Sequence, residues 1–380
     1  MNELWLRALS AIFMSSAIFL GLLLTKKIFR RKIATLAMPF LLFAPFLLRY
    51  GFEIRMYGLA TFLAVLATFL LICLVEKPSR RNWILYGLVV VAGMLTFNLM
   101  VLIFLAHLIY ILIKWRESRS SKVLRTALKS YGLALVLYLP WIPFAISQLT
   151  GSASSGVENL LGPAQIINIF SFAFLYQPEF WLNPLTALVI TIAISLAIYV
   201  ISIIMRKFSS SERDITKLFL LILVVPIGAI MLLSLILGRQ FWLERYILLF
   251  IIFGYLILAV ACAKSILVSS QRQRLKFIAI YFFFIITLLF GTLNLADIGN
   301  YNFQRMEENN AREIATTINC REQTIVKEIQ LYFALDYYLP DCTELYFYAP
   351  MNTSFDHGYA PIKDSSKLLR EIPGGVRVIK

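Results

Sequence analysis

The residues of this chain best suited to chemistry form two short clusters in which a carboxylate accompanies arginine. The first cluster, residues 53–57, has the sequence EIRMY and lies between two long apolar runs. The second, residues 239–246, has the sequence RQFWLERY. Charged residues at a membrane boundary are costly to place, so they mark functional sites by default. These two clusters are therefore the first candidates for a site.

Arginine determines what chemistry the clusters could do. Its guanidinium is a planar, permanently charged fork that binds phosphate oxygens two at a time. Arg55 in the first cluster, with Arg239 and Arg245 in the second, could together hold a phosphate or diphosphate on a lipid carrier. The structural alternative is that Glu53 pairs with Arg55 or Arg245 and only ties two loops together.

The composition places both clusters in a membrane protein. Of the 380 residues, 60% are hydrophobic and 15% are charged, and the mean hydropathy is +0.78. A soluble core could not bury so much apolar surface. Backbone in contact with lipid must form its own hydrogen bonds, and long apolar runs without strict alternation exclude a barrel. The predicted fold class is an all-α polytopic membrane protein with about ten transmembrane helices.

Ten apolar runs are long enough, or nearly long enough, to cross a bilayer. The candidate spans are residues 8–24, 33–49, 57–75, 83–98, 100–113, 130–148, 184–205, 218–237, 246–268 and 277–293. The fourth and fifth runs could instead form one bent hairpin, which would reduce the number by one.

The loops between these spans differ sharply in charge. Every second loop is basic, and this set contains 22 Lys and Arg residues. The opposite loops before residue 294 contain only Arg7, Arg49, Arg55, Arg239 and Arg245. Cytoplasmic loops carry the excess of cations, so both clusters are predicted to face outward from the plasma (inner) membrane. The net charge of +15 reflects this topology, and nucleic acid is not an expected partner.

One outward loop, residues 149–183, contains no Lys or Arg but several aromatic residues between 170 and 181. We expect it to lie along the membrane interface as a short amphipathic helix, with aromatic rings at headgroup depth. Stacking of those rings on a substrate is the alternative.

The chain changes character near residue 295. Residues 305–318 and 328–338 have helical patterns, whereas 324–327, 345–348 and 376–380 have strand patterns. Such alternation predicts a small α/β domain with a parallel sheet. We therefore expect a transmembrane domain over 1–294 and an extracytoplasmic domain over 295–380. Cys320 and Cys342 could pair there, but their spacing leaves both the bridged and the free state open.

The residues available for acid–base or metal chemistry are few. His107 and His357 are the chain's two histidines, which leaves almost no material for a serine–histidine triad or a histidine metal site. His107 lies in an apolar span and is interpreted as an interior histidine. No glycine-rich phosphate loop is present. The outward loops of the membrane region contain no aspartate, and their glutamates are Glu3, Glu53, Glu158, Glu179 and Glu244.

Four short motifs, taken in order, resemble GT-C glycosyltransferases of the protein mannosyltransferase and lipid A aminoarabinose transferase group. The motifs are LRALSA at 6–11, Pro45 followed by EIRMY at 53–57, LPWIP at 139–143 with Gln148, and RY at 245–246. The resemblance covers most of the chain, and an outward C-terminal α/β domain suits bacterial members.

The resemblance implies transfer of a sugar from a polyprenyl-phosphate carrier to an extracytoplasmic lipid, glycan or protein, with inversion. A carboxylate would take the proton of the acceptor hydroxyl while cations stabilise the departing lipid phosphate. Arg55 and Arg245 are the implied phosphate contacts, and Glu53 and Tyr57 would shape the cleft. Arg239 and Tyr246 complete the expected binding residues.

The resemblance also raises an expectation about the N-terminus. The family's catalytic acid, usually aspartate, lies in a first outer loop ahead of the segment that Leu6-Arg7 resembles. This chain is expected to lack that loop and the span before it. The base is therefore unassigned, and Glu3, Glu53 and Glu244 are its candidates. A divalent ion such as Mg²⁺, shared between carboxylates and phosphate, is a further hypothesis without a visible ligand set.

Two other functions stay open. A transporter or flippase for a lipid-linked glycan needs polar residues along a path through the spans, and these are nearly absent. A non-catalytic subunit that binds the lipid carrier or assists assembly is consistent with the expected lack of the first loop.

Overall fold

The structure is a computed structural model that describes residues 3–118, 121–151, 170–176, 184–237, 244–307, 311–350, 366–373 and 376–379. The chain divides into two compact units. One consists of residues 1–145 and 156–295, and the other of residues 146–155 and 296–380.

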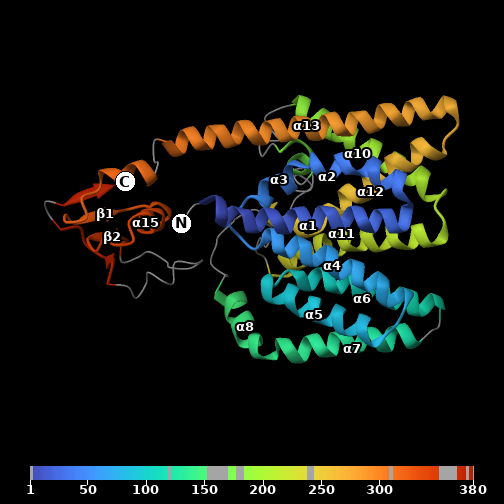
Figure 1. Cartoon of the computed structure of the whole chain (residues 1–380), viewed down its shortest axis with the longest axis horizontal. Coiled ribbons are helices and arrows are strands. Elements are labelled where there is room, and N and C mark those ends of the chain that lie inside the picture. The colour runs from blue at the N-terminus through green and yellow to red at the C-terminus, as the bar shows by residue number, and fades with distance from the viewer. Residues whose placement is uncertain are drawn as a thin grey trace. The chain divides into compact units, whose positions relative to one another are not determined.

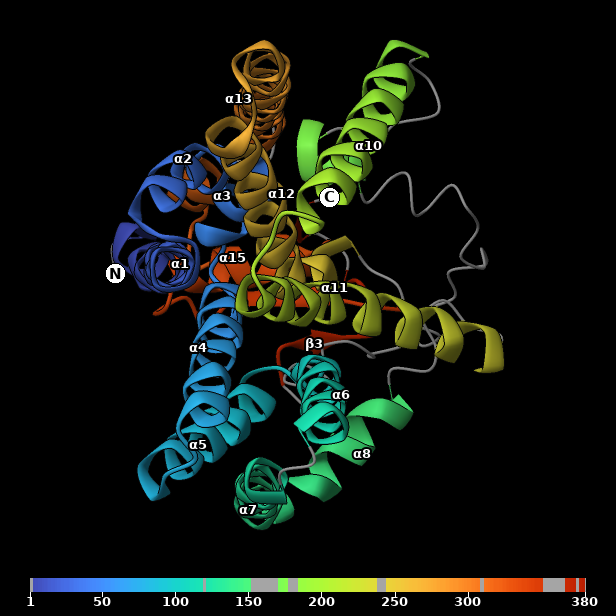
Figure 2. The same cartoon turned by 90° about the vertical axis from the view of Figure 1, so that its right-hand side faces the viewer.

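The larger unit is a bundle of helices that run side by side (Figures 1 and 2). The helices are α1 (Glu3–Phe29), α2 (Arg31–Leu42), α3 (Pro45–Gly51), α4 (Tyr57–Glu76), α5 (Arg80–Thr96), α6 (Met100–Ser118), α7 (Ser121–Tyr138), α10 (Pro184–Met205), α11 (Ser210–Leu237), α12 (Leu248–Val268) and α13 (Gln271–Glu307). Short elements follow some of them: η1 (Leu139–Trp141), α8 (Ile142–Gly151) and η4 (Glu244–Ile247). Residues 146–151 of α8 and 296–307 of α13 belong to the smaller unit.

The multi-span helical class is confirmed, and the described residues contain fewer candidate spans than the ten predicted. Within the described residues, seven helices are long and apolar enough to cross a membrane, or eight if α2 and α3 form one broken span. Helices α5 and α6 form where two spans were predicted. However, α5 has only 17 residues, and the last turns of α6 carry Lys114, Arg116 and Glu117. Both therefore fall short of a continuous apolar span.

The predicted span 33–49 is broken into α2 and α3, which meet at 64°. Pro45 has no N–H to continue the helix, and it forces the preceding residue, Ala44, into an extended conformation. The break frees the carbonyl of Phe43, which accepts a hydrogen bond from the Thr292 hydroxyl of α13 at 3.1 Å. A neighbouring helix thus satisfies the backbone where lipid could not.

Helix α12 occupies the centre of the bundle and packs against α2, α4, α10 and α11 (Figure 2). All residues from Leu248 to Phe253 and from Tyr255 to Ser265 are buried. A helix that is apolar on all sides is expected to be covered by protein, as α12 is.

The connections between helices gather at two ends of this bundle. Direct contacts join all five basic connections that the sequence places on one side of the membrane. These contacts are Lys27–Glu76, Phe29–Phe208, Lys114–Asp214 and Lys264–Glu212. The five strongly basic loops therefore lie together at one end of the bundle. That the basic end is cytoplasmic stays a prediction.

The prediction for the outward loop, residues 149–183, is wrong in one part. Residues 170–175 form a helical segment whose Phe174 ring packs into the bundle, whereas Phe170 and Phe172 are half-buried. Phe174 is buried, with ring centroids 6.1 Å from Tyr255 and 5.9 Å from Phe284. The Asn294 amide donates to the Leu175 carbonyl at 2.9 Å. Residues 152–169 and 177–183 of this loop lie outside the described part of the chain.

The smaller unit contains a parallel sheet with strand order β3-β2-β1-β4. Its elements are α14 (Ala311–Thr317), β1 (Thr324–Val326), α15 (Ile329–Tyr338), β2 (Leu345–Tyr348), β3 (Leu368–Leu369) and β4 (Arg377–Ile379). The predicted small parallel sheet is thereby confirmed. Strand β3 was missed because two residues are too few for a recognisable pattern.

A disulfide joins Cys320 to Cys342, with Cα atoms 5.0 Å apart. It closes a loop across 22 positions of sequence. We predict that the double variant Cys320→Ser/Cys342→Ser weakens this unit by about 3 kcal/mol, because the unfolded chain regains the freedom that the cross-link removed. Amide hydrogen exchange of β1 and β2 in the full chain should then become about 100-fold faster.

Cys73→Ser is the matched control, since Cys73 is a free thiol in α4. It should leave exchange in β1 and β2 unchanged. Equal protection of those strands in the double variant and the wild type would contradict a stabilising role for the bridge.

Candidate functional site

The first cluster, residues 53–57, is a short loop between α3 and α4 that the start of α1 holds in place. The Arg7 guanidinium donates to the Phe52 carbonyl at 3.2 Å. The Ser10 hydroxyl donates to the Arg55 carbonyl at 3.1 Å. Within the loop, the Arg55 N–H donates to the Glu53 carbonyl at 2.8 Å. These bonds fix the backbone and leave the side chains to interact with a ligand.

Gly58 allows α1 to come this close. A Cβ atom at this position would lie only 2.5 Å from the Ser10 carbonyl oxygen. Any other residue would push the two helices apart and draw the Ser10 hydroxyl away from Arg55. The LRALSA motif of α1 and the residue after the EIRMY motif therefore pack directly on each other.

Glu53 and Arg55 form an ion pair, with Arg55 Nε 3.3 Å from Glu53 Oε1. The Arg55 side chain is half exposed, whereas that of Glu53 is 22% exposed. The other carboxylate oxygen of Glu53, Oε2, is buried and has no hydrogen-bond partner in the described part of the chain. An unpaired buried acceptor costs about 1–3 kcal/mol, so such groups call for a functional explanation.

Aromatic rings connect the first cluster to the second. The ring of Tyr57 is buried and lies 5.3 Å from that of Tyr50 and 6.1 Å from that of Phe97. Phe97 in turn lies 5.8 Å from Tyr246 of the second cluster. The structure therefore brings Tyr57 and Tyr246 into contact with the same ring. Sequence reasoning missed Phe97, although the polar Asn98 beside it marked a break between two apolar runs.

The remaining predicted residues fall partly beyond what the structure describes. Arg239 lies in the segment 238–243, outside the described residues. Glu244 and Arg245 belong to η4 and Glu3 begins α1, but the side chains of all three are likewise undescribed. Their predicted roles stay predictions.

Other polar contacts support this end of the bundle. Arg49, an exposed residue of α3, donates from Nε to the Tyr176 hydroxyl at 3.1 Å. The Tyr138 hydroxyl donates to the Asn98 side-chain oxygen at 3.3 Å. In the LPWIP motif that follows Tyr138, a 3-10 turn, η1, separates α7 from α8.

One buried polar group elsewhere has a structural explanation. Buried His107 is hydrogen-bonded through Nε2 to Thr68 at 3.1 Å and through Nδ1 to Tyr86 at 3.0 Å, as an interior histidine should be. Among the described residues, no group of three or more His, Cys, Asp or Glu side chains could hold a metal ion. No described residue is therefore assigned to a divalent ion.

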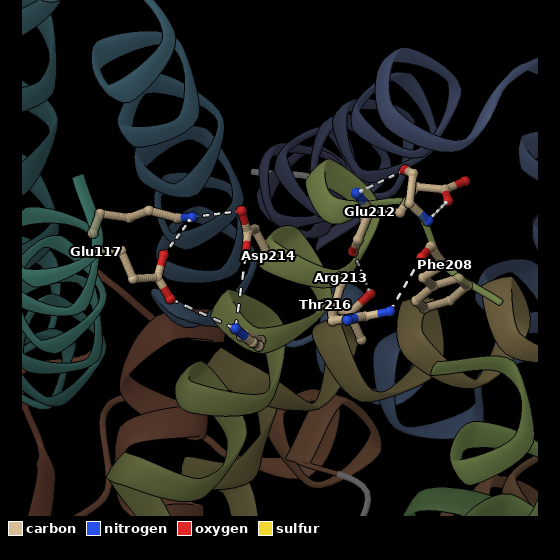
Figure 3. A network of polar contacts seen from close by, with 9 residues as sticks. Glu117, Phe208, Glu212, Arg213, Asp214 and Thr216 are labelled. Atoms are coloured by element: carbon tan, nitrogen blue, oxygen red, sulfur yellow. Dashed lines mark hydrogen bonds and ion pairs between the residues drawn. The ribbon is translucent and has the colours of Figure 1, made fainter. Parts of the chain in front are cut away.

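The basic end of the bundle carries a network of ion pairs (Figure 3). Lys114 of α6 contacts Glu117 at 2.9 Å and Asp214 of α11 at 2.5 Å. Lys217 lies 3.7 Å from Glu117 and 3.8 Å from Asp214. Each charge in this group has an opposite charge beside it, which indicates that the group joins α6 to α11.

Comparison with known proteins agrees with the resemblance drawn from the motifs. Residues 1–144 match the family model of dolichyl-phosphate-mannose-protein mannosyltransferase. No curated protein sequence matches the chain. The described loop at 53–57, with its α1 contacts and with Tyr57, lies inside the matched residues.

The fold is similar to that of ArnT from Cupriavidus metallidurans. The apo structure of ArnT matches with a TM-score of 0.55 at 12% identity, covering 91% of this chain and 71% of that one. ArnT bound to undecaprenyl phosphate matches with a TM-score of 0.56 at 13% identity, covering 93% and 73%. The predicted resemblance to GT-C glycosyltransferases is confirmed, by a family match over 1–144 and by the fold over most of the chain.

Proposed function

We propose that this protein is a membrane glycosyltransferase that takes a sugar from a polyprenyl-phosphate carrier and passes it to an acceptor with inversion. The observation that carries the proposal is the Glu53–Arg55 pair on a loop that α1 holds rigidly. A half-exposed arginine on a fixed backbone is suited to hold a phosphate group. The binding of undecaprenyl phosphate by ArnT supports a carrier of the same class.

In the proposed reaction, the acceptor oxygen attacks the anomeric carbon as the bond from that carbon to the phosphate oxygen breaks. Negative charge develops on the departing lipid phosphate, and the Arg55 guanidinium stabilises it there. Arg245 and Arg239 of the second cluster are proposed to contact the same group. Tyr57 and Tyr246, which both pack on Phe97, shape the wall between the two clusters.

The acceptor hydroxyl must lose its proton to a base. Glu53 is the candidate base whose side chain is described, and its Oε2 lacks a hydrogen-bond partner among the described residues. Glu53 also orients Arg55 through Oε1. Glu3 and Glu244 remain alternative bases on the strength of their positions near the same end of the bundle.

The site is proposed to face the extracytoplasmic side of the plasma membrane, because the opposite end carries the basic connections. The Cys320–Cys342 disulfide supports an oxidising compartment for the smaller unit. The acceptor would then be an extracytoplasmic lipid, glycan or protein.

A donor comparison tests the proposal. The full chain is reconstituted in liposomes with an extract of envelope acceptors and with radiolabelled mannose or aminoarabinose, supplied either on undecaprenyl phosphate or on a nucleotide. We expect label to reach an acceptor from a lipid-phosphate donor and not from a nucleotide donor. Movement of the intact labelled carrier across the bilayer without transfer would contradict the proposal and favour a transporter. Carrier binding with neither activity would favour a non-catalytic subunit.

A further inference from the structure

A cavity of about 480 Å³ opens between α5 and α7 at the basic end of the bundle. The first cluster, residues 53–57, lies at the other end of the bundle, so this cavity does not belong to the site described above. The cavity is lined by Pro78, Ser79, Arg80, Trp83, Thr126 and Lys129.

The register of the two helices explains why a space exists at this point. Gly87 of α5 approaches Ser130 of α7 so closely that a Cβ atom on it would lie 2.8 Å from the Ser130 carbonyl oxygen. Trp83 and Thr126 stand four residues, or one turn, before these two contact residues. The helices are thus in contact at Gly87 and Ser130, and the cavity lies one turn nearer to their N-terminal ends.

The electrostatics of the cavity favour an anion. Arg80 and Lys129 are both exposed, and neither has an ion-pair partner within the described residues. Glu76, the acid closest to Arg80 in sequence, is engaged by Lys27 at 2.6 Å. The cavity includes Ser79 and Arg80 at the N-terminal end of α5, so the positive end of that helix dipole adds to the two cations.

Polar lining groups provide directional donors. The Ser79 hydroxyl oxygen accepts a hydrogen bond from the Asn82 N–H at 3.3 Å, which leaves its own hydrogen able to donate. Trp83 is half-buried, and tryptophan is enriched at membrane interfaces because its ring is apolar while its N–H is polar. The cavity therefore offers two cations and hydrogen-bond donors beside an interfacial aromatic ring.

We propose that this cavity binds the phosphate of an acidic phospholipid headgroup. A lipid fits better than a free anion because the two cations lie beside the half-buried ring of Trp83 in a membrane protein, and tryptophan rings lie at headgroup depth. Basic pockets between membrane helices are known to hold anionic headgroups. The inference rests on the cavity and its charges, and it is independent of the proposed transferase activity.

Native mass spectrometry of the full chain in detergent tests the proposal, with dioleoyl phosphatidylglycerol as the probe. We expect Arg80→Gln/Lys129→Gln to weaken binding of the first lipid by about 30-fold, since two cations near the headgroup are lost. The matched control is Arg272→Gln/Lys276→Gln, which removes two exposed cations at the start of α13. The control should change this affinity less than about twofold.

Unchanged lipid binding in the cavity variant, or an equal loss in both variants, would overturn the proposal. The single variants Arg80→Gln and Lys129→Gln give the same test if the double variant does not fold, with about fivefold losses expected. Competition with inorganic phosphate separates the two sources of the anion. Displacement of the lipid by low millimolar phosphate would show a free-anion site and overturn the assignment to a headgroup.

Discussion

Replacing Arg55 with alanine should lower sugar transfer from a polyprenyl-phosphate donor by at least about 100-fold, the scale for removing one charge-stabilising donor. The half-exposed guanidinium is positioned by Glu53, and its backbone is held by Ser10. The loss should appear mainly in kcat, because negative charge on the leaving phosphate develops in the transition state. Initial rates of transfer in liposomes measure the effect.

Two further variants make this result specific. Arg55→Lys keeps the charge but loses the planar fork, so it should recover only part of the rate. Arg49→Ala removes an arginine at the same end of the bundle that is bonded to Tyr176, and it should reduce the rate less than fivefold, as expected of a surface contact. Near-normal transfer by a folded Arg55→Ala protein would mean that Arg55 only ties the loop together.

Replacing Lys264 with methionine should lower the free energy of unfolding by about 3 kcal/mol, a value typical of breaking a buried ion pair. The side chains of Lys264 and Glu212 are 10% and 15% exposed, and Lys264 Nζ donates to Glu212 Oε2. The ammonium also lies 4.6 Å from the centre of the Phe208 ring. Without Lys264, the Glu212 carboxylate keeps its hydrogen bond from the Ser209 N–H, 2.7 Å long in the wild type, but loses its counter-ion.

A double-mutant cycle distinguishes the ion pair from simple packing. Lys264→Met/Glu212→Gln should be less destabilised than the sum of the single variants, by about 1 kcal/mol or more. Thermal unfolding in detergent provides the comparison, and Lys276→Met is the control, since Lys276 is exposed on α13. A Lys264→Met protein as stable as that control would contradict a buried, paired charge.

Features set by local composition could be predicted from the sequence. Apolar runs must be helices in lipid, so the helical membrane class followed directly. The Lys and Arg residues of alternate loops separated the two ends of the bundle, because charges cannot be left inside it. The strands at 324–326 and 345–348 and the parallel sheet followed from alternation of strand and helix. The first cluster, residues 53–57, could be found because it places two charged residues between two long apolar runs.

Features set by contacts between distant residues could not be predicted. The break between α2 and α3 is tolerated because Thr292 lies beside Phe43 after a separation of 249 residues. The segment 170–175 is buried because Asn294 and Tyr255 reach it from other helices. Phe97 joins the site only because its extended backbone directs the ring between Tyr57 and Tyr246.

The sequence by itself determined the helical class, the two ends of the bundle and the residues with the charge to bind a phosphate. Only the tertiary structure decided that Ser10, Gly58 and Phe97 belong with them. The physical reason is that hydropathy and charge are properties of each residue and can be read along the sequence. Close helix packing depends on which backbones meet, and that is determined only when the whole bundle assembles.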